Sequence, residues 1–164
     1  MSEESRQHFS ELLQRHRGVV YKVAHSYAWT PEDRADLAQE IATQLWRAFP
    51  GYDGRRPFPT WMYRVALNVA ISQVRREERQ RRQRVTLDVM PDVVDESAAS
   101  PESLVALEQL QKVIAAQDPL NRALVLLYLD DYGNREIGDI LGLTETNVST
   151  RISRLKQRIR ERMK

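Results

Sequence analysis

The chain has 164 residues, of which 41% are hydrophobic and 29% are charged, and it contains no cysteine. This length allows one ordinary domain or two small ones. The lack of cysteine excludes disulfides and thiolate zinc sites and is typical of a reducing cytoplasm. The N-terminus has no signal-peptide core, and no apolar run reaches the ~20 residues that a membrane span needs. We therefore expect a cytoplasmic protein.

The net charge is only +2, but the charges are unevenly distributed. Nine arginines lie between Arg55 and Arg84, and a second basic segment runs from Thr146 to the C-terminus. Between them, residues 85–104 carry five acids and no base. Two basic segments separated by an acidic one indicate two contacts with a polyanion joined by a tether. The alternative is that these arginines are simply solvated at helix ends.

The chain divides at residues 85–100, which predict a flexible linker. This stretch combines acids with Pro91 and two serines, and it has neither an aromatic residue nor helical periodicity. Elsewhere apolar residues recur at helical spacing. We expect an all-α chain of two small helical domains, residues 5–84 and 101–164, joined by this flexible acidic linker. The second domain is expected to end in a helix-turn-helix.

Three helices are predicted in the first domain. Apolar residues at helical spacing predict one amphipathic helix from Phe9 to Tyr27. A second helix begins at Pro31, because proline in the first helical position loses no hydrogen bond. A third helix starts at Phe58 and runs into the arginines. Opposite its apolar stripe, the second helix carries a polar face made of Asp36, Gln39, Glu40, Thr43 and Arg47.

The C-terminal residues 135–164 follow the pattern of a DNA-reading helix-turn-helix. After a short apolar-faced helix, Gly142 is placed to end it in the left-handed conformation, and Thr144 is placed to cap the next helix. Periodicity points a polar and basic set on that helix away from the core: Thr150, Ser153, Arg154 and Gln157. This set is flanked by Asn147, Arg151 and Arg158.

The residue types on this face suit DNA. Arginine can grip guanine, and asparagine or glutamine can pair with adenine, each good pair contributing ~1–3 kcal/mol of discrimination. Lys156, Arg158 and Arg160 would neutralise phosphates. The alternative interpretation is an ordinary basic helical hairpin.

Three stretches together resemble the extracytoplasmic-function (ECF) sigma factors of bacterial RNA polymerase. Region 2.2 of that family is similar to "ADLAQEIATQLWRAF", and regions 2.3 and 2.4 are similar to "FPTWMYRVALNVAISQVRR". Region 4 is similar to "PLNRALVLLYLDDYGNREIGDILGLTETNVSTRISRLKQRIRERM". The resemblance implies an alternative sigma factor that binds core RNA polymerase and directs promoter-specific initiation. It would read −35 and −10 elements and aid strand opening.

The resemblance also implies roles for individual residues. The residues that would dock on the clamp helices of the polymerase β′ subunit are Asp36, Gln39, Glu40 and Thr43. The loop that pockets a flipped base of the −10 element is Tyr52, Asp53, Gly54, Arg55 and Arg56. The helix face along melted DNA is Thr60, Trp61, Arg64 and Asn68. Recognition of the −35 element falls to Thr150, Arg151, Ser153 and Arg154, with Asn147, Gln157 and Arg158 beside them.

Two positions in the third helix carry a second interpretation or a departure from the family. Trp61 can equally be a core residue, because Phe58 and Val65 are close along the helix. Leu67 stands where the family often has a basic residue, so we expect no DNA contact there.

The expected partners are core RNA polymerase, through its β′ clamp helices and β subunit, and promoter DNA. Family members are commonly held inactive by an anti-sigma protein, often one bound to the inner face of the membrane. No cofactor or metal is expected, since the three histidines stand eight and nine residues apart, which is not ligand spacing. An enzyme is disfavoured because no phosphate loop or nucleophile elbow occurs. A regulator that binds operator DNA without core polymerase is the remaining alternative.

Overall fold

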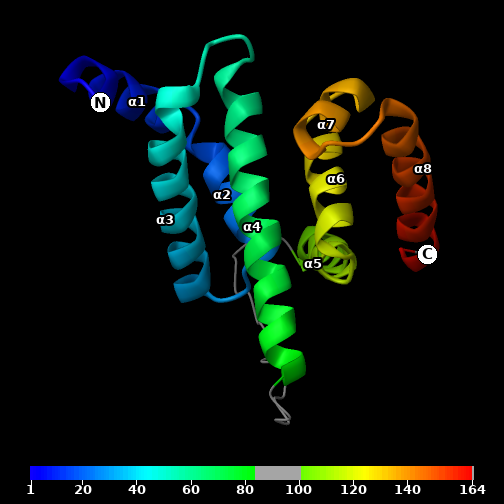
Figure 1. The fold of residues 1–164 in the computed structure, drawn as a ribbon. Helices are drawn as coiled ribbons and strands as arrows, with labels where there is room; N and C mark the ends of the chain where they lie inside the picture. The colour runs from blue at the N-terminus through cyan, green and yellow to red at the C-terminus, as the bar shows by residue number, and fades with distance from the viewer. Residues whose placement is uncertain (84–100, 164) are drawn as a thin grey trace. The chain divides into compact units, whose positions relative to one another are not determined.

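The structure is a computed structural model that describes residues 1–83 and 101–163. Every regular element in these ranges is a helix, so the all-α prediction is confirmed (Figure 1). The chain divides into two compact units, Met1–Val74 and Arg75–Lys164, and the boundary falls inside one long helix. The predicted linker, residues 85–100, lies outside the described residues.

The first unit is built around α2 (Arg17–Tyr27), α3 (Pro31–Ala48) and the first part of α4 (Phe58–Gln83). α1 (Glu3–Arg15) precedes them, and a short 3-10 turn, η1 (Phe49–Gly51), follows α3. The core comes from one face of each main helix, as the apolar spacing requires. Its largest fully buried side chains are Val23, Leu37, Ile41, Leu45, Met62, Tyr63 and Leu67.

The prediction of one helix from Phe9 to Tyr27 was wrong, because α1 and α2 are separate helices. The chain turns at His16, whose φ of −112° and ψ of 21° are not helical. The Val19 N–H donates to the His16 carbonyl at 3.1 Å, which is a tight turn. Gly18 lies in the first turn of α2, and glycine favours helix interiors less than any residue but proline. Figure 1 shows that the two helices point in different directions.

The start of α3 follows the sequence signals closely. Thr30 caps the helix, its hydroxyl accepting from the Asp33 N–H at 3.1 Å, and Pro31 occupies the first turn. Glu32 and Asp33 place negative charge at the positive end of the helix dipole. These features fix where α3 begins and therefore which of its faces is buried.

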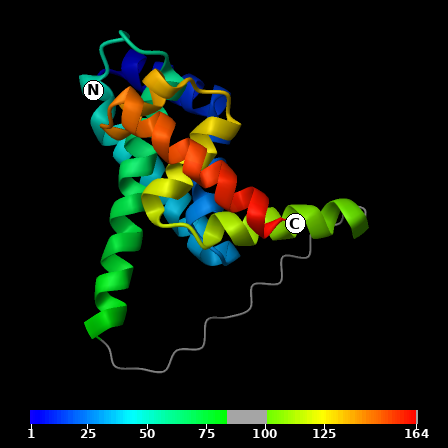
Figure 2. The same ribbon diagram turned by 90° about the vertical axis from the view of Figure 1, so that its right-hand side faces the viewer.

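The second unit contains α5 (Pro101–Ala115), α6 (Pro119–Leu129), α7 (Asn134–Leu141) and α8 (Glu145–Arg162). α7 and α8 form the predicted helix-turn-helix, and Figure 2 shows them in sequence at the end of the chain. Gly142 ends α7 with φ of +72°, and the Thr144 hydroxyl caps α8 by accepting from the Asn147 N–H at 3.1 Å. Ile137 and Val148, both fully buried, pack the two helices together.

A buried arginine closes the turn between α5 and α6. Arg122 is only 9% exposed, and its guanidinium donates from Nε to the Gln117 carbonyl and from Nη2 to the Ala115 carbonyl, each at 3.0 Å. Cations are favourable beside carbonyls at a helix C-terminus. Asp118 caps α6 by accepting from the Asn121 N–H at 2.8 Å. The second unit is thus held by polar contacts as well as by its apolar core.

Candidate nucleic-acid interface

The outer face of α8 is polar and open. Thr150, Ser153 and Arg154 are exposed, whereas Ile152 and Leu155 on the opposite face are buried. The predicted set therefore lies on one accessible side of the recognition helix, with Gln157 and Arg158 continuing it toward the C-terminus. Such a helix can enter a major groove, which is wide enough to admit one.

Arg151 is held in place on this face. Its Nε donates to Asn147 Oδ1 at 2.8 Å, one helical turn earlier. The two side chains border a shallow pocket of about 190 Å³, lined by Asn121, Asn147, Thr150, Arg151, Arg154, Leu155 and Arg158. Asn121 comes from α6 and was missed by the sequence reasoning. Only its position two residues after the helix-starting Pro119 could have drawn attention to it.

Lys156 occupies a different environment from its basic neighbours. Its ammonium lies 4.4 Å from the ring centroid of Tyr128 on α6, at a distance suited to a cation–π contact. Lys156 is half-buried, whereas Arg158 and Arg160 are exposed. The structure therefore offers Arg158 and Arg160 to solvent but ties Lys156 to the body of the unit.

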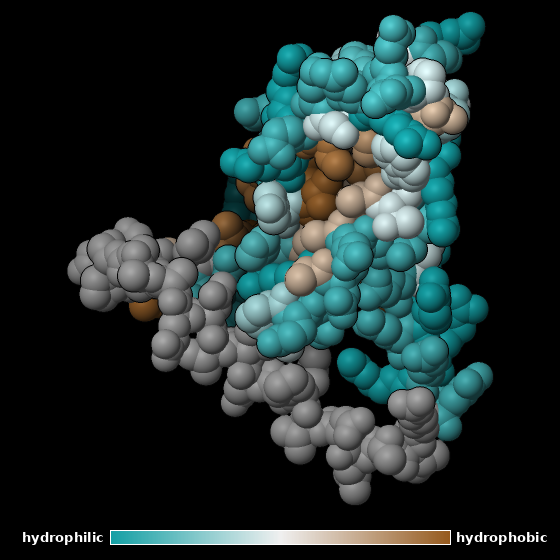
Figure 3. Space-filling model, turned by 90° about the vertical axis from the view of Figure 1, so that its left-hand side faces the viewer, coloured by the Kyte–Doolittle hydropathy of each residue, from teal (hydrophilic) through white to brown (hydrophobic). Residues whose placement is uncertain are grey.

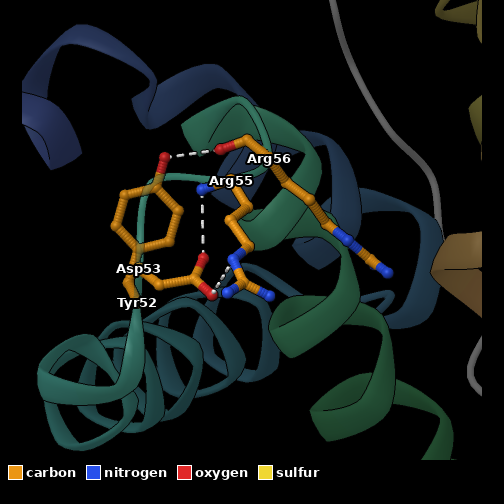
Figure 4. Close-up of polar contacts among 4 residues, drawn as sticks. All are labelled: Tyr52, Asp53, Arg55 and Arg56. Atoms are coloured by element: carbon orange, nitrogen blue, oxygen red, sulfur yellow. Dashed lines mark hydrogen bonds and ion pairs between the residues drawn. The ribbon is translucent and has the colours of Figure 1, made fainter.

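The loop before α4 is closed by its own hydrogen bonds (Figure 4). The Tyr52 hydroxyl donates to the Arg56 carbonyl at 2.6 Å, which spans the loop. Asp53 accepts from the Arg55 N–H at 3.0 Å and its carboxylate lies 3.4 Å from Arg55 Nε. Gly54 adopts φ of +77°, a conformation that side chains disfavour. The predicted flipped-base loop thus has a defined shape, with the Asp53 and Arg55 side chains in solvent.

Aromatic rings pack between this loop and the start of α4. The Trp61 ring centroid lies 5.1 Å from that of Tyr52 and 5.4 Å from that of Phe58, and Phe49 stands 6.3 Å from Trp61. Phe9 of α1 extends the group, at 5.0 Å from Phe49. We call these five residues the ring cluster. Phe58 is buried, but Trp61, Tyr52 and Phe49 remain partly exposed.

Trp61 is therefore both packed and accessible. Its ring contacts the other rings of the cluster at the start of α4 and in the loop, and part of its indole remains at the surface. On the same helix Arg64 and Asn68 are exposed and Thr60 is half-buried. Leu67 is 1% exposed and belongs to the core of the first unit.

The polar face of α3 is accessible as well. Asp36, Gln39 and Glu40 are exposed. Thr43 is half-buried, and its hydroxyl donates to the Gln39 carbonyl at 2.9 Å. Glu40 accepts from Gln44 Nε2 at 3.0 Å, so its carboxylate is oriented along the helix. Figure 3 shows hydrophilic side chains over much of the face in view, with hydrophobic ones near its centre.

Two of the three histidines, His8 and His16, lie against aromatic rings. His8 lies 6.1 Å from Phe49 and His16 lies 5.8 Å from Phe58, measured between ring centroids. Within the described ranges, no group of three histidine, cysteine or acidic side chains could hold a metal ion. In the same part of the chain, the search for a helix of sufficient length and apolarity to cross a membrane found none.

Models of known protein families match segments of both units. The family model of sigma-70 region 2 matches residues 12–80, and that of sigma-70 region 4 matches residues 107–159. The chain belongs to the ECF sigma factors. It is 24% identical to the ECF RNA polymerase sigma factor SigW of Bacillus subtilis, over 95% of this chain and 89% of that one. It is 29% identical to SigE of Mycolicibacterium smegmatis, over 93% of this chain but only 60% of the longer relative.

Solved sigma-factor structures share the fold. The structure of CnrH in complex with the cytosolic domain of CnrY matches with a TM-score of 0.67 and 20% identity, over 95% of this chain and 87% of that one. The sigma factor RpoE, in complex with the anti-sigma factor NepR from Bartonella quintana, matches with a TM-score of 0.71 and 15% identity, over 99% and 98%.

The ECF sigma factor described here is accordingly an alternative sigma factor for transcription initiation. The region 2 match contains α2, α3 and most of α4, and the region 4 match contains α6, α7 and most of α8. The polar face of α3, the closed loop and the exposed face of α8 all lie inside these matches.

Proposed function

We propose that residues 5–84 dock this ECF sigma factor on core RNA polymerase and read the −10 element, while residues 101–164 read the −35 element. Core docking is assigned to Asp36, Gln39, Glu40 and Thr43. The observation that supports it is a continuous accessible face on α3 with two carboxylates and no basic residue among these four. Such a face complements a basic partner surface and speeds association.

Strand opening is assigned to the loop from Tyr52 to Arg56 and to the first turns of α4. Extruding a base costs a few kcal/mol, and stacking on an aromatic side chain returns ~1–3 kcal/mol per base. The half-exposed Trp61, braced by Tyr52 and Phe58, provides a rigid stacking surface beside the loop. Arg64 and Asn68 extend this surface with polar side chains along α4.

Recognition of the −35 element is assigned to α8. Arg154 and Thr150 are exposed at the centre of the face, and Arg151 is oriented by Asn147. A guanidinium that is already oriented loses less side-chain entropy when it binds a base or a phosphate. Ser153, Gln157 and Arg158 complete the contact area.

The chain is further proposed to work in the cytoplasm, without catalytic activity or a cofactor of its own. CnrH and RpoE, its structural neighbours, were solved with CnrY and NepR. By extension, we propose that an anti-sigma protein binds this chain and, where that protein is membrane-bound, holds it at the inner face of the membrane.

The deciding experiment is transcription in vitro with purified core polymerase and fragments of the source genome. The full chain plus core enzyme should initiate at defined start sites, whereas the chain alone should bind the same fragments weakly. Tight DNA binding by the chain alone, with no initiation in the presence of core enzyme, would instead identify a regulator that binds operator DNA.

A further inference from the structure

Two helix corners of the molecule are built from the same kinds of residue at the same spacing. One corner joins α2 to α3 in the first unit, and the other joins α5 to α6 in the second (Figure 1). Each has a capping side chain, Thr30 or Asp118, then a proline, and an arginine four residues after the cap. The sequences are "TPEDR" at 30–34 and "DPLNR" at 118–122, so only the proline and the arginine are identical.

At both corners the arginine is hydrogen-bonded to the end of the preceding helix. Arg34 Nε donates at 3.0 Å to the carbonyl of Ala28, the C-cap residue of α2. Arg122 donates from Nε to the Gln117 carbonyl and from Nη2 to that of Ala115, the last residue of α5, each at 3.0 Å. The last carbonyls of a helix lack partners within it, and a guanidinium offers several donors in one plane. Each arginine thus ties the start of one helix to the end of another.

The corner between α7 and α8 is capped in the same way but lacks this arginine. Thr144 caps α8, no proline follows it, and the fourth residue after the cap is the fully buried Val148. Burial of an apolar side chain therefore holds that corner. A capped helix start does not by itself require an arginine, so the arginines of the other two corners need their own explanation.

Arg34 lies where it can set the orientation of α3. Its side chain is half-buried, and at 100° per residue it falls within about 20° of the buried Ile41 and Leu45. Asp36, on the face assigned to core docking, is about 160° away around the helix. The hydrogen bond to α2 therefore holds α3 from the side opposite the docking face. It fixes the direction in which that face points.

Arg122 has a similar relation to the −35 face. Its neighbour Asn121 lines the pocket on the outer face of α8. Further along α6, the ring of Tyr128 contacts Lys156 of α8. α6 thus contributes to the surface of α8 near its start and near its end, while its start is tied to α5. A change in the direction of α6 would move one side of the pocket relative to the arginines of α8.

We propose that Arg34 and Arg122 are positioning residues, one for each of these contact faces. Arg34 orients the polymerase-docking face of α3, and Arg122 orients the side of the −35 pocket that α6 provides. This proposal rests on the proposed function, which assigns the two faces. A side chain that only raised stability would leave the affinity of the folded chain unchanged, whereas a positioning residue changes that affinity.

The test compares three replacements of Arg34 in the full chain. Arg34→Met reaches the Nε position but has no donor there. Arg34→Gln places an amide N–H at that position without the charge, whereas Arg34→Lys keeps the charge but places a methylene there. Affinity for core polymerase is measured well below the unfolding midpoint of each variant, at a temperature where circular dichroism shows that the variant is folded.

Arg34→Gln should bind core enzyme about as tightly as wild type does. Arg34→Met and Arg34→Lys should bind it about two- to thirtyfold more weakly, which is the range for coupling carried by packed elements. Their discrimination between intact and altered −35 elements should not change. Wild-type core affinity in folded Arg34→Met would overturn the proposal. So would a loss in the glutamine variant that the lysine variant avoids, since charge and not the Nε donor would then be responsible.

Arg122→Met and Arg122→Gln are the matched variants in the second unit. Glutamine can restore the bond to Gln117 but not the bond to Ala115. Discrimination of the −35 element should therefore fall about two- to thirtyfold with methionine and by less with glutamine, while core binding stays near wild type. An equal loss of core binding and −35 discrimination in these variants would show general destabilisation and would overturn the proposal.

The proposal remains testable if a methionine variant does not fold. Arg34→Gln and Arg34→Lys then decide for the first corner, and Arg122→Gln decides for the second. Failure of the wild-type chain to initiate with core enzyme would overturn the proposed function. Initiation by wild type, with unchanged core affinity and −35 discrimination in every folded variant, would overturn this inference alone.

Discussion

Gly138 is the residue at which α7 passes closest to the turn before α8. A Cβ built there would lie 2.5 Å from the Leu143 carbonyl oxygen, closer than real side chains come. The same approach allows the Leu143 N–H to donate to the Gly138 carbonyl at 2.9 Å. The helix-turn-helix thus depends on the absence of one methyl group.

Gly138→Ala should lower the free energy of unfolding by about 1–3 kcal/mol, the usual cost of forcing extra atoms into a packed site. Calorimetry of the full chain would measure the change. Gly18→Ala is the matched control, because a Cβ at Gly18 meets nothing within 4 Å and lies in a helix. It should leave stability unchanged or raise it by up to about 1 kcal/mol. Equal destabilisation by both changes would contradict the close-approach argument.

Trp61 shows what residue-level sequence reasoning could not decide. Helical periodicity places Phe58 one turn before Trp61 and predicts contact between the two side chains. Their ring centroids lie 5.4 Å apart. Its contacts with Phe49 and Tyr52 join residues twelve and nine positions away, across a turn and a loop. No local pattern predicts how such a loop folds back, so only the structure could assign Trp61 to both a core and a surface.

At the scale of elements, local signals predicted the helix-turn-helix well because its stops and starts depend on neighbouring residues. Gly142 and Thr144 act through their own backbone and through an N–H three residues on. The break at His16 was missed because apolar spacing continues across it, and Gly18 alone is a weak breaker. The existence of helices was therefore predictable, whereas the boundary between α1 and α2 at His16 was not.

Thr144→Ala should destabilise α8 by about 1 kcal/mol, because it removes the acceptor for the Asn147 N–H. The loss should appear as a lower unfolding midpoint of the full chain in denaturant. Thr144→Ser retains a hydroxyl and serves as the control, with stability close to wild type. If serine and alanine lowered the midpoint equally, the capping hydrogen bond would not be the cause.

At the scale of the whole molecule, core polymerase binding and −35 recognition are assigned to different units, so a substitution should be able to impair one without the other. Glu40→Lys reverses a charge on the polar face of α3. The lysine would then face the basic partner surface proposed above, and repulsion between like charges lowers the affinity of a complex. We expect it to weaken core polymerase binding about tenfold or more and to leave the fold intact, since Glu40 is exposed. Affinity for labelled core enzyme measures this directly.

Arg154→Ala is the companion variant in the second unit. Core binding should stay near the wild-type value, while discrimination between promoters with intact and altered −35 elements should fall by about 1–3 kcal/mol. Equal loss of core binding and −35 discrimination in either variant would show that the two faces do not act separately.

The ring cluster has a consequence for genetics. Phe9 belongs to α1, to which no DNA contact is assigned, yet its ring touches Phe49 and, through it, the supports of Trp61. Genetic screens for variants that are defective in promoter melting should therefore yield substitutions of Phe9 as well as substitutions in the loop from Tyr52 to Arg56. Such alleles should be temperature-sensitive, because they weaken the packing of the ring cluster. They leave every side chain that we propose to contact DNA unchanged. Their intragenic suppressors should map to the partners of the lost ring, Trp46 of α3 and Phe49 of η1.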